Sequence, residues 1–115
     1  MFEFQKLEVY KKAKEFHTDT NQLITAIKPN KTVKDQLSRA SFSIVLNLAE
    51  GSGRFSKPDR RNFFVIARGS VFECVAILDV LNDQQLIDGA TFDSFLKKAD
   101  ELSRILYTMV KNLNT

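Results

Sequence analysis

Apolar residues recur at spacings of three and four in four stretches of the chain, roughly residues 5–26, 32–50, 57–81 and 92–113. Such spacing places one side of a helix in a core, whereas a half-buried strand would alternate apolar and polar residues. No stretch of this sequence shows that alternation. The pattern therefore predicts an all-α protein with four helices.

Residues that begin helices stand ahead of three of these stretches. Thr32 is followed three residues later by Asp35, which is the spacing of a capping box. Ser56 precedes Pro58, and proline is tolerated in the first turn of a helix. The fourth helix is expected to begin at a cap, either Asp88 or Thr91.

Residues that end helices separate the same stretches. Pro29 is expected to end the first helix. Gly51 or Gly53 suits the left-handed position at the end of the second helix. Because the connections between the helices are short, we expect an antiparallel up-down-up-down four-helix bundle, formed as a single domain by residues 1–115.

The second and third helices carry more apolar residues than one buried side requires. A helix at the surface of a monomeric bundle should be polar on its outer side. Self-association is the favoured explanation, and contact with a different partner protein is the alternative. The residues expected at an oligomer interface are Phe42, Val45, Leu46, Val65, Phe72 and Val75.

Polar residues within the same pair of helices require partners. Antiparallel pairing would set Arg39 opposite Glu73, and Ser43 opposite Gly69 and Ser70, with Gly69 allowing a close approach. The favoured interpretation is a buried structural ladder of ion pairs and hydrogen bonds, and the alternative is a polar active site. The residues of this ladder are Arg39, Asn47, Glu50, Arg68, Ser70 and Glu73.

Composition and charge indicate where the protein is located and what kind of partner it binds. The 115 residues include one cysteine and no apolar run long enough to span a membrane, and the first residues do not resemble an export signal. These features indicate a cytoplasmic protein. The formal net charge is +3, but residues 31–70 carry eight Lys or Arg against three acids, whereas residues 71–115 carry four against seven. Such asymmetry points to an anionic partner for the basic part.

Candidate catalytic chemistry is sparse. His17 is the only histidine, and its position on an apolar stripe favours a packing role. Cys74 lies among apolar neighbours, which favours an inert buried thiol. The sequence shows no metal-ligand spacing, phosphate-binding loop or dinucleotide fingerprint. We therefore expect a protein that is not an enzyme and that binds neither a metal nor another cofactor.

Three ordered motifs resemble a known family. They are QLSRA at residues 36–40, NLAEGSGR at 47–54 and IARGSVFE at 66–73, and matching segments near both ends extend the resemblance over nearly the whole chain. The sequence is similar to the four-helix-bundle proteins encoded in 23S rRNA intervening sequences, the S23 ribosomal protein family. That family is similar to the accessory variability protein of diversity-generating retroelements, a pentamer that works with nucleic acid. The resemblance implies a bacterial homopentamer.

Basic residues are expected to gather at one end of the predicted bundle, where the turn between helices two and three meets the two chain ends. RNA or DNA could be bound there, mainly through phosphates, with RNA preferred because of the family's genomic setting. The alternatives are a solvated turn and a scaffold that docks an acidic partner protein. Phe55, next to this cluster, could stack on a base or pack at the oligomer seam. The basic residues are Lys6, Arg54, Lys57, Arg60, Arg61 and Lys111.

Overall fold

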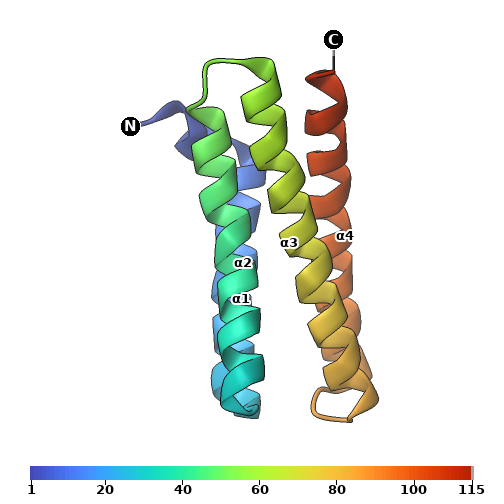
Figure 1. The fold of residues 1–115 in the computed structure, drawn as a ribbon. Coiled ribbons are helices and arrows are strands. Elements are labelled where there is room, and N and C mark those ends of the chain that lie inside the picture. The colour runs from blue at the N-terminus through green and yellow to red at the C-terminus, as the bar shows by residue number, and fades with distance from the viewer. Residues whose placement is uncertain (115) are drawn as a thin grey trace.

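Four long helices form an antiparallel bundle in the computed structural model, which describes residues 1–114 (Figure 1). The elements are a short 3-10 helix η1 (Glu3–Lys6) and the helices α1 (Glu8–Ile27), α2 (Lys31–Ser52), α3 (Lys57–Asp83) and α4 (Gly89–Asn112). The bundle measures 44 × 26 × 22 Å. The predicted all-α four-helix bundle is confirmed.

Side-chain caps begin α2, α3 and α4. Ser56 Oγ accepts from Asp59 N at 3.2 Å, and an Asp88 carboxylate oxygen accepts from Thr91 N at 2.7 Å. The predicted cap at Thr32 is wrong, because Asn30 Oδ1 accepts from Val33 N at 2.9 Å and starts α2 earlier. Each cap satisfies a backbone N–H that has no partner within the helix.

The helix ends differ from the expectation for the glycines. The left-handed residues in the described part of the chain are Lys28 at the end of α1 and Gln85 after α3, rather than Gly51 or Gly53. Gly51 instead lies inside α2, where a Cβ would come within 2.7 Å of Phe64 Cε1 and 2.9 Å of Phe63 Cβ. This glycine is required by close packing between α2 and α3.

Apolar side chains from all four helices meet along the axis of the bundle. The largest fully buried ones include Phe16, Leu37, Ile44, Leu78 and Leu106. Val45 was expected at an oligomer interface but is only 6% exposed, because α2 contacts both α1 and α3 and buries residues toward each. Val75 is partly buried against the same core. Both residues therefore belong mainly to the packing of the single chain.

Candidate functional site

Six basic residues from η1, the turn between α2 and α3, the start of α3 and the last turn of α4 lie at one end of the bundle. The turn between α2 and α3 shares this end with η1 and with the last turn of α4 (Figure 1). The remaining two turns lie at the opposite end, with Asp83 and Asp88. We call the cluster of six basic residues the basic end, and it consists of Lys6, Arg54, Lys57, Arg60, Arg61 and Lys111.

Contacts within the chain orient the arginines of the basic end. Arg60 Nε donates to the backbone oxygen of Arg54 at 2.6 Å, and Arg61 Nε donates to Asn114 Oδ1 at 2.7 Å. The Arg54 guanidinium lies 4.6 Å from the centre of the Phe63 ring. Since a guanidinium has five N–H donors, Arg60 and Arg61 keep several for another molecule.

Few acids neutralise the basic end. Lys6 pairs with Glu3 at 3.3 Å, and Arg54 lies 3.8 Å from Glu50, both in exposed positions where ion pairs contribute little. Within residues 1–114 no ion pair is formed by the other four members of the basic end, Lys57, Arg60, Arg61 and Lys111. The cluster is therefore a net positive surface.

Phe55 projects from the turn beside these cations. Its side chain is 102% exposed, more than any other large apolar side chain in the described structure. A hollow of about 380 Å³ lies beside it, lined by Ala49, Glu50, Gly53, Arg54, Phe55, Ser56 and Asp59. The basic end thus combines cations with a free aromatic ring.

The outward side of α3 carries a second candidate surface. Phe72 is 54% exposed, and Val65 and Val80 are also exposed. Gly69 and Ala76 lie between them, so the five residues follow one another at spacings of 4, 3, 4 and 4. We call this set the outer stripe, and it consists of Val65, Gly69, Phe72, Ala76 and Val80.

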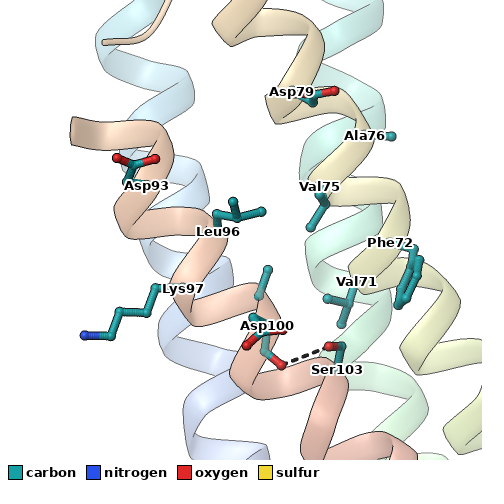
Figure 2. Close-up of a pocket in the computed structure, with 11 residues that line it drawn as sticks. Val71, Phe72, Val75, Ala76, Asp79, Asp93, Leu96, Lys97, Asp100 and Ser103 are labelled. Atoms are coloured by element: carbon teal, nitrogen blue, oxygen red, sulfur yellow. Dashed lines mark hydrogen bonds between the residues drawn. The ribbon is translucent and has the colours of Figure 1, made fainter. Parts of the chain in front are cut away.

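The helices on either side of α3 also carry exposed apolar residues. On α2, Phe42 and Leu46, both predicted at an oligomer interface, are exposed. Between α3 and α4, a groove of about 670 Å³ includes Val75 and Leu96, whose side chains extend into the space between the helices (Figure 2). Asp79, Asp93 and Asp100 give this groove an acidic border.

The predicted polar ladder takes a different form. Ser70 Oγ donates to Ser43 Oγ at 2.9 Å and so joins α3 to α2, and Asn47 Nδ2 donates to the same Ser43 hydroxyl at 2.9 Å from within α2. The expected buried ion pairs are wrong for the single chain, because Arg39, Glu50 and Glu73 are exposed and no ion pair joins Arg39 to Glu73 within residues 1–114.

Arg68 also departs from the predicted ladder, because it turns toward α4 rather than α2. Its Nε donates to the backbone oxygen of Ser103 at 3.1 Å. The guanidinium lies 4.8 Å from the ring centre of Phe72 and 5.5 Å from that of Tyr107. These contacts hold the two exposed rings in place, and Phe72 also lines the groove between α3 and α4.

His17 has a structural environment. Ser41 Oγ donates to the Ser38 carbonyl oxygen, so it accepts from His17 Nδ1–H at 2.7 Å, and Nε2 accepts from Asn21 Nδ2 at 3.3 Å. The imidazole also stacks on Phe42, with 5.0 Å between ring centres. Burial lowers the pKa of His17. These contacts orient the ring in its neutral form.

Cys74 is completely buried, and this burial raises its pKa to about 12. A thiol with such a pKa is almost entirely protonated near neutral pH and is a poor nucleophile. Residues 1–114 contain no group of three His, Cys, Asp or Glu side chains that could hold a metal ion. In the same residues, no helix is both long and apolar enough to cross a membrane.

Comparisons with known proteins identify relatives of this chain. The family model described as 23S rRNA-intervening sequence protein matches residues 5–108. One similar solved structure is that of a protein of unknown function from the S23 ribosomal protein family of Bacteroides thetaiotaomicron VPI-5482. The two chains are 22% identical, with a TM-score of 0.83, and the match covers 90% of this chain and 98% of that chain. No curated protein sequence matches this chain.

Proposed function

The chain belongs to the 23S rRNA-intervening sequence protein family, and on this premise we propose that it is a homo-oligomeric RNA-associated protein. The observation that carries the proposal is the basic end, where six cations from three parts of the sequence converge and four of them form no ion pair within residues 1–114. RNA is favoured over DNA because of the family to which the chain belongs.

Phosphate groups are the natural ligands of the basic end. Arginine and lysine side chains contact phosphate oxygens regardless of base sequence, and each such contact releases counterions. The hydrogen bonds of Arg60 and Arg61 to the chain hold these side chains in place before RNA arrives. Binding should therefore depend weakly on sequence and strongly on salt.

The outer stripe supports self-association. Its three large members are exposed apolar residues on one side of a long helix, and Phe42 and Leu46 are further exposed apolar residues on α2. Contiguous apolar surfaces of this kind mark contacts with other proteins. A closed ring would bring several basic ends together, and five subunits is the number that the resemblance implies. Repetition would strengthen RNA binding through multivalency.

A charge-removal experiment tests the RNA proposal. The first variant replaces Arg54, Lys57, Arg60 and Arg61 with glutamine, and the matched control replaces Lys28, Lys31, Lys34 and Lys97. Both variants lose four positive charges, so a difference between them reports position rather than net charge. Affinity for a short RNA is measured by fluorescence anisotropy over a range of salt concentrations.

We expect the first variant to lose most RNA binding, and the slope of log affinity against log salt to decrease by up to about 3. The control should stay close to the wild type. Equal binding by the first variant and the wild type would contradict the proposal. An acidic partner protein could use the same cations, and a low 260/280 absorbance ratio of the purified wild type, with no added RNA bound, would favour that alternative.

A further inference from the structure

Phe55 occupies a position where a large apolar side chain gains nothing from the chain itself. Turns of this kind usually contain glycine, proline, asparagine, aspartate or serine. Phe55 is instead followed by Ser56 and preceded by Arg54, and its ring is fully exposed. Single exposed apolar residues are common on protein surfaces, so the surroundings of Phe55 must decide whether it has a role.

The other aromatic rings at this end have partners. Phe4 packs edge-on against Phe2 and Tyr10, at 5.8 and 4.9 Å between ring centres. Phe63 is covered by the Arg54 guanidinium. Within residues 1–114 no ring and no cation is stacked on Phe55. Its faces are therefore free to receive a flat ligand.

The hollow beside Phe55 fits a base better than a phosphate. Glu50 and Asp59 line it together with Arg54, so two carboxylates face one guanidinium and the excess of negative charge disfavours an anion at close range. The same carboxylates can accept hydrogen bonds from the amino and imino groups of nucleobases. Lys57, Arg60 and Arg61 lie in the adjoining first turn of α3, without acidic partners in the described residues, and can contact the flanking phosphates.

The position of Phe55 argues against a role at the oligomer seam. Gly53, the residue directly after α2, is seven residues beyond Leu46, or about 10 Å along the helix axis. Val65, the first member of the outer stripe, lies eight residues into α3, or about 12 Å from its start. Phe55 thus lies about two helical turns beyond the exposed apolar surface on either helix.

We propose that Phe55 stacks on an unpaired nucleobase, so that the basic end selects single-stranded over double-stranded RNA. This inference rests on the proposed RNA association and adds the form of the RNA. Bases in a duplex are already stacked on each other, whereas bases in single strands and loops can stack on aromatic side chains. The cations would contact phosphates in both forms, and the ring would contribute only with the single strand.

The experiment compares the full chain with its Phe55→Ala, Phe55→Tyr and Phe2→Ala variants. Phe2 is the matched control because it is also an exposed phenylalanine at this end of the bundle. Each protein is titrated by anisotropy with a labelled single-stranded RNA and with a duplex of the same sequence. Sedimentation velocity on the same samples reports the oligomeric state.

We expect Phe55→Ala to weaken single-strand binding about 5- to 150-fold, the range for removing a stacking aromatic side chain. Its duplex binding should stay at the wild-type level, and Phe55→Tyr and Phe2→Ala should retain the preference for the single strand. A Phe55→Trp substitution would introduce the only tryptophan of the chain. Its fluorescence should be quenched by the single strand and not by the duplex.

Several results would overturn the inference. Unchanged single-strand binding by Phe55→Ala, while the glutamine variant loses binding, would remove the stacking role and leave the proposed function standing. A changed sedimentation coefficient for Phe55→Ala would assign Phe55 to the oligomer seam. Absence of RNA binding by the wild type would overturn both proposals together.

Discussion

The two sides of α3 have similar apolar character but very different surroundings. On the inner side, Val71 is 1% exposed, and Cys74 and Leu78 are buried in the same core. On the outer stripe, the next residue after Val71, Phe72, is 54% exposed. The packing of the single chain accounts for the inner residues and does not account for the outer ones.

This difference separates residues that are buried within one chain from residues that could be buried only against another subunit. Burying a large apolar side chain stabilises a protein by about 1.5–3 kcal/mol, so the inner side needs no further explanation. The outer stripe would gain that stabilisation only from another surface. Self-association predicts that changes on the inner side alter stability, whereas changes on the outer stripe alter assembly.

The largest expected effect is loss of assembly in Phe72→Asp. A carboxylate in the centre of an apolar interface would be desolvated without a partner, which is strongly unfavourable. We expect the wild type to sediment as an oligomer and Phe72→Asp as a monomer with an unchanged helical circular dichroism spectrum. Thr108→Asp, at an exposed position of α4, is the control and should remain oligomeric. A wild type that is monomeric at micromolar concentration would contradict the role given to the outer stripe.

The next largest effect is expected in the rates at which cysteines on the two sides of α3 react with a thiol reagent. Cys74 is buried with a pKa raised to about 12, so it should react with a thiol reagent only when the protein unfolds. A cysteine introduced by Ala76→Cys lies on the outer stripe. It should react orders of magnitude faster than Cys74 in the Phe72→Asp background and be protected in the wild-type background.

Equal labelling of this cysteine in both backgrounds would indicate that nothing covers the outer stripe. Rapid labelling of Cys74 in the folded wild type would contradict its placement in the core. Mass spectrometry distinguishes the two thiols, so each rate is measured within the same sample.

A stability change of intermediate size is expected at Gly51, on the side of α2 that packs on α3. A Cβ there would approach Phe63 Cβ and the buried Phe64 ring too closely. Overpacking of this kind costs about 1–3 kcal/mol, which exceeds or offsets the better helix propensity of alanine. We expect Gly51→Ala to lower the melting temperature in both the wild-type and the Phe72→Asp backgrounds. A raised melting temperature would show that the contact relaxes easily.

The sequence predicted the helices well because local signals defined them. Ser56 was predicted as a helix start and Asp88 as one of two candidates beside Thr91, and both Ser56 and Asp88 cap helices in the structure. The start at Asn30 was missed because Thr32, two residues later, stands at capping-box spacing from Asp35. The basic end was predictable because topology alone brings the chain ends to the turn between α2 and α3.

Assignment of the flanking apolar residues was less successful. Val45 belongs to the core, although it was predicted at an oligomer interface. Each of the two central helices contacts two neighbours, so its buried side is wider than one stripe. Periodicity could have revealed the outer stripe, because Gly69, Ala76 and Val80 continue the spacing of Val65 and Phe72.

The smallest effect is expected for Gly69→Ala. This substitution should stabilise the single chain but weaken assembly. A Cβ at Gly69 would meet no other described side chain or neighbouring helix within 4 Å, so the single chain gives no packing reason for glycine. Gly69→Ala should therefore stabilise the monomeric Phe72→Asp background by up to about 1 kcal/mol, through helix propensity alone. In the wild-type background the added methyl group would push back a helix of another subunit and weaken assembly, which sedimentation equilibrium can measure. Stabilisation in the monomer together with unchanged assembly would mean that no helix approaches Gly69 closely, and the outer stripe would then have to be covered at Phe72 and Val80 instead.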